Sequence, residues 1–179
     1  MFAKILTAIV AITSSSVYAY GPQSELDKAM AYVDSYINSN NLSDKENNEK
    51  KSQLTNLLKG FAGIELSIYF KTDSADIDKQ GRHQIYQIAK TLWVYPDPTV
   101  RLRLDAYTDV RGSKKYNLKL SEKRLAAVQK VFMNAMGDRY DEKRFYTGIK
   151  GETRASYSPK DEEGMSLDRK VTITLFVQS

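Results

Sequence analysis

Residues 105–124 read DAYTDVRGSKKYNLKLSEKR, and the rest of the chain is organised around them. The stretch begins at the end of a predicted strand, in which apolar residues alternate with polar ones at Val100, Leu102, Leu104 and Ala106. A polar turn at 108–112 follows, and then a helix that carries Arg124 about three turns from its start. We therefore expect the carboxylate of Asp109 and the guanidinium of Arg124 to face one pocket.

Two groups of opposite charge in one pocket can bind the charged ends of an amino acid. A carboxylate accepts hydrogen bonds from an ammonium, while a guanidinium holds a carboxylate at two points. The alternative is that Asp109 and Arg124 form only a structural ion pair between a loop and a helix. Exposed pairs of that kind are common and contribute about 0–1 kcal/mol.

The stretch also carries a recognisable pattern, Thr108-Asp109, then Gly112, Asn117 and Leu120-Ser121-x-x-Arg124. With these residues the chain resembles the OmpA/MotB-type peptidoglycan-binding domain, and the spacing from Asp109 to Arg124, 124 − 109 = 15, is the spacing of that family. The resemblance extends over about residues 62–177. It includes the segments 70–74 and 167–171.

The resemblance implies that Asp109 and Arg124 grip the diaminopimelate of peptidoglycan stem peptides, which offers an ammonium and a carboxylate on one residue. It assigns further residues to the same site, namely Thr108, Val110, Asn117, Asp73 and Arg169. On local grounds alone, Asp73 is equally well explained as a turn or helix-cap residue.

The first 19 residues predict a cleaved signal peptide, with a short basic start, an apolar run at 5–12 and a small-residue cleavage site ending at Ala19. An uncleaved membrane anchor needs about 20 apolar residues, and this run is less than half as long. We therefore expect no membrane span in the mature chain. The chain contains no cysteine, which excludes disulfides and the lipid-bearing cysteine of a bacterial lipoprotein.

Residues 20–61 predict a helical extension outside the resemblance. Ser24 can cap a first helix with apolar residues at helical spacing, and Ser43 with Glu46 forms a capping box for a second. The two are compatible with a helical hairpin. Its apolar stripes either pack on the domain or bind a partner protein, and the sequence does not separate these alternatives.

Residues 62–179 predict one further domain. We expect strands at 64–70, 100–106, 145–149 and 171–177, helices at about 78–94 and from the quoted stretch to Gly137, and a polar loop at 151–166. Strands separated by helices need crossover connections, which favours a mixed sheet with two helices on one face. The predicted fold class is therefore α/β, a two-layer sandwich of order βαβαββ, and the OmpA-like resemblance implies the same fold.

Composition excludes several classes of function. The 27 basic and 22 acidic residues give a net charge of +5 on a mixed surface, which does not predict a nucleic-acid partner. The one histidine, His83, has no second metal ligand near it, and no cysteine nucleophile or glycine-rich phosphate loop is present. Asp105 and Asp109 lie on one strand end without the flanks of a sugar groove. We predict no metal, no cofactor and no catalytic residue.

We predict a non-catalytic peptidoglycan-binding protein of the Gram-negative periplasm, associated with the cell wall or the outer membrane. It would tether an envelope protein or machine through residues 20–60. A single charged clamp is weak, so retention would depend on the repeating polymer or a multimeric partner. The alternative is a protein–protein adaptor that keeps this fold without binding the wall.

Overall fold

The computed structural model describes residues 65–94 and 99–177, together with single positions at 31, 43, 45, 46, 48, 49, 52, 53, 62 and 63. The predicted signal peptide and most of the predicted helical extension lie outside the described residues. The capping box in the extension is confirmed. The carboxylate of Glu46 accepts from the backbone N–H of Ser43 at 3.0 Å, and the Ser43 hydroxyl accepts from the backbone N–H of Glu46 at 3.4 Å.

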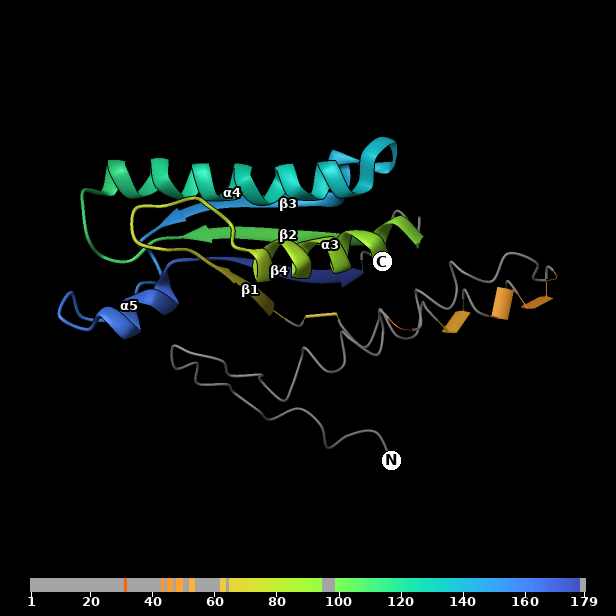
Figure 1. Ribbon diagram of the computed structural model, residues 1–179, viewed down its shortest axis with the longest axis horizontal. Coiled ribbons are helices and arrows are strands. Elements are labelled where there is room, and N and C mark those ends of the chain that lie inside the picture. Colours follow the sequence, from red (N-terminus) through yellow and green to blue (C-terminus); the bar gives the residue numbers. More distant parts are fainter. Residues whose placement is uncertain are drawn as a thin grey trace, which may run out of the picture.

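Among the described residues, one mixed sheet is formed by β1 (Glu65–Tyr69), β2 (Val100–Tyr107), β3 (Phe145–Gly151) and β4 (Lys170–Val177), in the order β1-β4-β2-β3. Strand β4 is antiparallel to both of its neighbours, with Ile173 opposite Leu66 on β1 and Leu104 on β2. Strands β2 and β3 are parallel, and Figure 1 shows a long helix above them. The predicted mixed sheet is confirmed.

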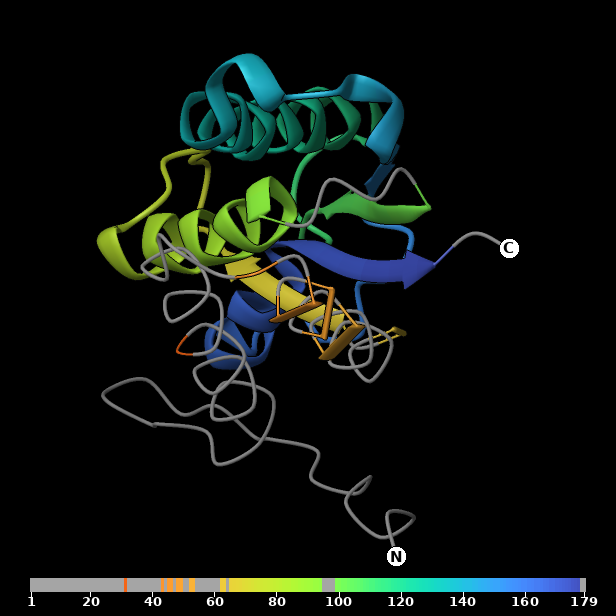
Figure 2. The ribbon, with the colours of Figure 1, turned by 90° about the vertical axis from the view of Figure 1, so that its right-hand side faces the viewer.

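Two helices, α3 (Lys79–Val94) and α4 (Lys114–Met136), lie together on one face of this sheet, as Figure 2 shows. Their apolar stripes meet the inward-facing residues of the strands. The core between the layers includes Ile68, Ile85, Leu92, Leu102, Leu104, Leu125, Val128, Phe132 and Ile173. The predicted two-layer arrangement is therefore confirmed, and within the described residues no helix is long and apolar enough to cross a membrane.

The prediction of an uninterrupted polar loop at 151–166 is wrong. Helix α5 (Glu162–Asp168) lies in this segment, and the Asp161 carboxylate caps it by accepting from the backbone N–H of Gly164 at 2.8 Å. Seven residues are too few to show the repeating apolar spacing by which a helix is predicted. Two short 3₁₀ turns, η1 (Gly137–Arg139) and η2 (Glu142–Arg144), connect α4 to β3, which runs to Gly151.

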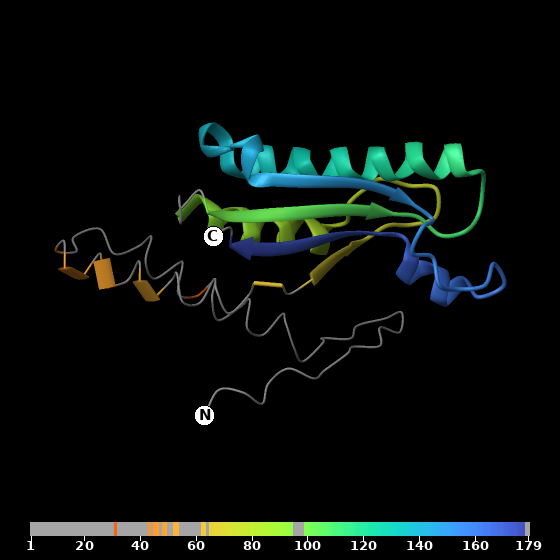
Figure 3. The same cartoon turned by 180° about the vertical axis from the view of Figure 1, so that it is seen from behind.

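Several connecting segments meet at one end of the sheet. The loop after β1, the turn after β2, the start of α4 and helix α5 all lie there, at the left of Figure 1 and at the right of Figure 3. These are the segments that carry most of the site residues predicted from the sequence.

Candidate functional site

The buried face of α4 changes from apolar to polar toward the start of the helix. Its later turns bury apolar side chains, but the same face continues through Arg124, Ser121 and Asn117. Leu118, an apolar residue near the start of the same helix, is 38% exposed. One helix therefore packs the core with its second half and carries polar side chains inward with its first half.

Two of these polar side chains, Asn117 and Arg124, line a cavity of about 280 Å³. Six of the seven predicted site residues line it, namely Asp73, Thr108, Asp109, Asn117, Arg124 and Arg169. Val110 is not among the lining residues, so its supporting role stays a prediction. The other lining residues are Thr72, Arg111, Gly112, Tyr116 and Leu120.

The guanidinium of Arg124 is fully buried and is held by the backbone. Its Nε donates to the carbonyl of Ser74 at 2.9 Å, Nη1 to that of Tyr107 at 2.9 Å, and Nη2 to that of Lys71 at 3.2 Å. An arginine has five N–H donors, so one N–H remains on each terminal nitrogen. Burial first, and then the nearby charge of Arg169, lowers the pKa of Arg124 to about 10, and the group stays charged at neutral pH.

Arg124 and Asp109 do not form a direct ion pair with each other, which was the alternative to a binding site in the sequence analysis. No described carboxylate lies within ion-pair distance of Arg124, and Asp109 is paired with two other arginines. Its Oδ1 accepts from the backbone N–H of Arg111 at 3.0 Å and from the Arg111 Nε at 3.3 Å. Its Oδ2 accepts from the Arg111 Nη2 at 2.6 Å and from the Arg169 Nη1 at 3.1 Å.

These contacts keep Asp109 ionised although it is buried. Burial alone raises the pKa of this carboxyl, but the hydrogen bonds from Arg111 and Arg169 outweigh it and hold the pKa below its ordinary value. Asp109 is therefore a carboxylate at neutral pH.

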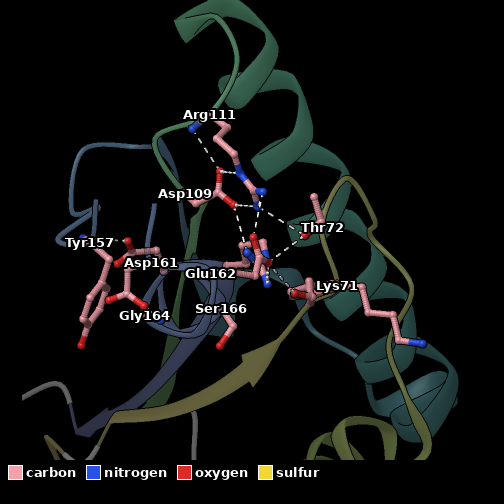
Figure 4. A network of polar contacts seen from close by, with 12 residues as sticks. Lys71, Thr72, Asp109, Arg111, Tyr157, Asp161, Glu162, Gly164 and Ser166 are labelled. Atoms are coloured by element: carbon pink, nitrogen blue, oxygen red, sulfur yellow. Dashed lines mark hydrogen bonds and ion pairs between the residues drawn. The ribbon is translucent and has the colours of Figure 1, made fainter. Parts of the chain in front are cut away.

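Glu162 of α5 joins the two arginines on their other side. Its carboxylate pairs with Arg111 at 2.9 Å and with Arg169 at 3.1 Å. Figure 4 shows the Arg111 side chain reaching from Asp109 toward Glu162 and Thr72. Asp109, Arg111, Glu162 and Arg169 thus form a closed ring of alternating charge, and all of them except Glu162 line the cavity.

The remaining predicted residues lie around this ring. Thr108 is buried, and its hydroxyl has no hydrogen-bond partner among the residues that the structure describes. The Asn117 amide donates to the backbone carbonyl of Asp109 at 3.4 Å. The Tyr116 hydroxyl donates to the carboxylate of Asp73, a residue held at a positive φ of 53°.

Two residues of the ring were not predicted as site residues. Arg111 lies in the polar turn at 108–112, two residues after Asp109. Its position and positive charge could therefore have pointed to a contact with Asp109. Glu162 is 51 positions farther along the chain and has no local pattern that points to the pocket. His83 is exposed on α3 with a ring nitrogen 3.1 Å from the Gln87 amide nitrogen, and the described residues hold no group of three or more acidic, His or Cys side chains suited to a metal ion.

Comparison with known sequences gives two kinds of outer-membrane relative. Outer membrane protein Omp38 of Acinetobacter baumannii is 29% identical over 112 residues, which are 63% of this chain and 30% of that protein. Outer membrane protein A of Bordetella avium is 32% identical over 107 residues, 60% of this chain and 53% of that protein. The chain thus spans less than two thirds of the length of either relative.

Comparison with solved structures gives proteins of the same fold. The peptidoglycan-associated lipoprotein of Burkholderia pseudomallei has a TM-score of 0.54 at 24% identity, covering 61% of this chain and 88% of that one. The C-terminal domain of MotB of Helicobacter pylori has a TM-score of 0.55 at 21% identity, covering 65% and 88%. The family model described as the OmpA family matches residues 69–169, more than half of the sequence. This confirms the resemblance read from the turn and helix at 105–124, and the chain belongs to the OmpA family.

Proposed function

We propose that this chain is a peptidoglycan-binding protein whose cavity holds the diaminopimelate of a stem peptide. Membership of the OmpA family agrees with the prediction that the chain is not an enzyme. One protein of the same fold is named a peptidoglycan-associated lipoprotein, which supports the proposed ligand class.

The observation that carries the proposal is the state of Arg124. A buried guanidinium with no carboxylate in ion-pair contact is costly, because three backbone carbonyls and the more distant charges of Asp109 and Asp73 only partly replace its water. The two remaining N–H groups, one on each terminal nitrogen, suit a carboxylate bound at two points. A ligand carboxylate in the cavity would supply the missing charge, and the buried hydroxyl of Thr108 offers a further hydrogen bond.

Asp109 is the second half of the proposed clamp. It lines the same cavity as Arg124 and is ionised at neutral pH. An ammonium on the same ligand residue would therefore find a carboxylate acceptor. Diaminopimelate carries both charged groups, whereas a simple carboxylic acid would use only one half of the site.

The cellular role extends this proposal. Residues 1–19 have the pattern of a signal peptide, which supports location in the periplasm. Residues 20–61 lie outside the matched family region and are the proposed contact with an envelope partner. Because one clamp binds weakly, many stem peptides on one polymer would hold the protein through effective concentration.

Co-sedimentation with purified diaminopimelate-type sacculi tests the clamp. We expect Asp109→Asn and Arg124→Lys to lower binding about tenfold or more, since a hydrogen bond to a charged group contributes roughly 1.5–3 kcal/mol. Asp105→Asn is the matched control for the first variant. Asp105 is a buried carboxylate on β2, the strand that leads into the Asp109 turn; it is paired with Arg103 at 2.7 Å and does not line the cavity.

Arg144→Lys is the matched control for the second variant. Arg144 is also buried and donates to the backbone carbonyls of Val100 and Leu92, at the other end of β2. Both controls should pellet with sacculi like the wild type, with thermal melts showing that all four variants are folded. Equal losses in site and control variants, or no binding by folded wild type, would favour the adaptor alternative.

A further inference from the structure

We propose that Arg111 is a built-in competitor for the ammonium group of the ligand, so that a ligand binds Asp109 only by displacing the Arg111 side chain. This inference rests on the proposed function. Arg111 lines the cavity, but the family pattern in residues 105–124 does not assign it to ligand binding.

The first argument is the acceptor capacity of Asp109. An ionised carboxylate offers about four lone-pair positions. All of these are filled in the structure, by three donors of Arg111 and one of Arg169. A ligand ammonium therefore has no free position on Asp109 while both arginines stay in place.

The second argument identifies which arginine can leave. The Arg169 side chain is 7% exposed and also donates to the backbone carbonyl of Phe70 at 3.2 Å. The Arg111 side chain is 36% exposed, and its other partners are the exposed side chains of Glu162 and Thr72. Rotation of Arg111 toward solvent would free one position on each oxygen of Asp109, while the backbone N–H of Arg111 and the Arg169 guanidinium would still hold the carboxylate.

This arrangement would act differently on ligands with and without a free amino group. A ligand that carries only a carboxylate can bind Arg124, but it has no cationic donor that could replace the Arg111 guanidinium on Asp109. A ligand that carries an ammonium as well replaces one cation on Asp109 by another, and no buried charge is left unpaired. We therefore expect Arg111 to lower slightly the affinity for a ligand with a free amino group, and to leave the affinity for a ligand without one unchanged.

The test uses a synthetic stem tripeptide that ends in diaminopimelate and is blocked at its amino terminus, so that its one free amino group is on the diaminopimelate. A second peptide carries an acetyl group on that amine. We expect Arg111→Gln to bind the free-amine peptide about two- to fivefold more tightly than wild type, because a partly exposed ion pair no longer competes. Its affinity for the acetylated peptide should not change.

Lys115→Gln is the matched control. Lys115 is exposed in the first turn of α4, so its replacement removes one positive charge from the same region without removing a contact to Asp109. It should bind both peptides like the wild type. Equal gains in the two variants would overturn the proposal, because they would indicate general charge repulsion. Unchanged or weaker binding of the free-amine peptide by Arg111→Gln would also overturn it.

A measurement on the wild-type protein keeps the test independent of the folding of any variant. The Nε–H resonance of Arg111, which donates to Asp109 in the free protein, should move toward the position of a solvent-exposed arginine as the free-amine peptide is added. A resonance that stays in place at saturation would overturn the proposal and leave the clamp intact. If neither wild type nor Arg111→Gln binds the peptide, the proposed function itself fails and this inference fails with it.

Discussion

Asp109 and Arg124 are both buried and charged, but their charges are compensated in different ways. Arg124 is surrounded by backbone carbonyls and keeps two N–H groups for a ligand, whereas Asp109 already has a full set of donors from Arg111 and Arg169. In the proposed complex, Arg124 would therefore gain an acceptor directly. Asp109 would gain a ligand only by exchanging one of its present donors for it.

The acid stability of the protein should report on Asp109. Its pKa in the folded state is lowered, so the ionised form stabilises the fold. This contribution is complete above the unfolded value of about 3.9 and is lost as the pH falls through the lower folded value. Asp109→Asn should cost about 1–3 kcal/mol at neutral pH. Thermal unfolding of both proteins between about pH 2 and pH 7 should show a Tm difference that shrinks below about pH 4. A constant difference would contradict this assignment.

Helix α4 combines two tasks that are separated along its length. Its first turns carry Asn117 and Arg124 into the cavity, and its last turns bury Phe132 and Met136 in the core. The two regions are about 20 Å apart, given a rise of about 1.5 Å per residue. Changes at the far end should therefore alter stability without altering the site.

Gly137 offers a test of this separation. It ends α4 at a φ of 55°, where its backbone N–H donates to the carbonyl of Met133, and a Cβ added there would meet no atom within 4 Å. Gly137→Ala should therefore cost about 1–2 kcal/mol of unfolding free energy from backbone strain alone. Denaturant unfolding should show this loss, and sacculus binding should stay at the wild-type level. Asn134→Ala, at an exposed position of the same helix, should change stability by less than about 0.5 kcal/mol. Loss of binding by folded Gly137→Ala would show that the two ends are coupled.

The whole molecule carries a net charge of +5, with a sequence pI of about 9.2. Anionic surfaces will attract it without any specific contact, so pelleting with the wall contains a part that does not use the cavity. The dependence of binding on salt concentration distinguishes the non-specific part from the part that uses the cavity. Attraction between exposed charges is screened over about 10 Å at 0.1 M ionic strength, while buried contacts are screened much less.

We accordingly expect the residual binding of Asp109→Asn to sacculi to disappear at about 0.5 M NaCl, where exposed charges are strongly screened. Most of the wild-type binding should remain at this salt concentration and should be displaced by a soluble diaminopimelate peptide. The same sedimentation assay over a salt series measures both effects. Parallel loss of binding by the two proteins would mean that the net charge, and not the clamp, holds the protein on the wall.

The features that the sequence predicts well are those that repeat or lie close together. Strand alternation at Leu102 and Leu104 and the turn at Thr108 and Asp109 follow from local rules, and the fold follows from the order of these elements. The contacts of Glu162 depend on how α5 sits against a turn 51 residues earlier, and no local rule gives that distance. Apolar spacing alone does not reveal the polar stripe of α4, and Asn117 and Ser121 are recognised only through the family pattern of the quoted stretch.

Strand β4, which follows the other three described strands in sequence, pairs with both β1 and β2. The sheet therefore cannot close until residues 170–177 are available, however early the other strands are made. Arg169, which stands directly before β4 and holds Asp109, reaches the cavity in the same step. If the chain crosses a membrane with its amino terminus first, the sheet would stay open during transit, and the cavity would be assembled only after residues 169–177 had arrived on the far side.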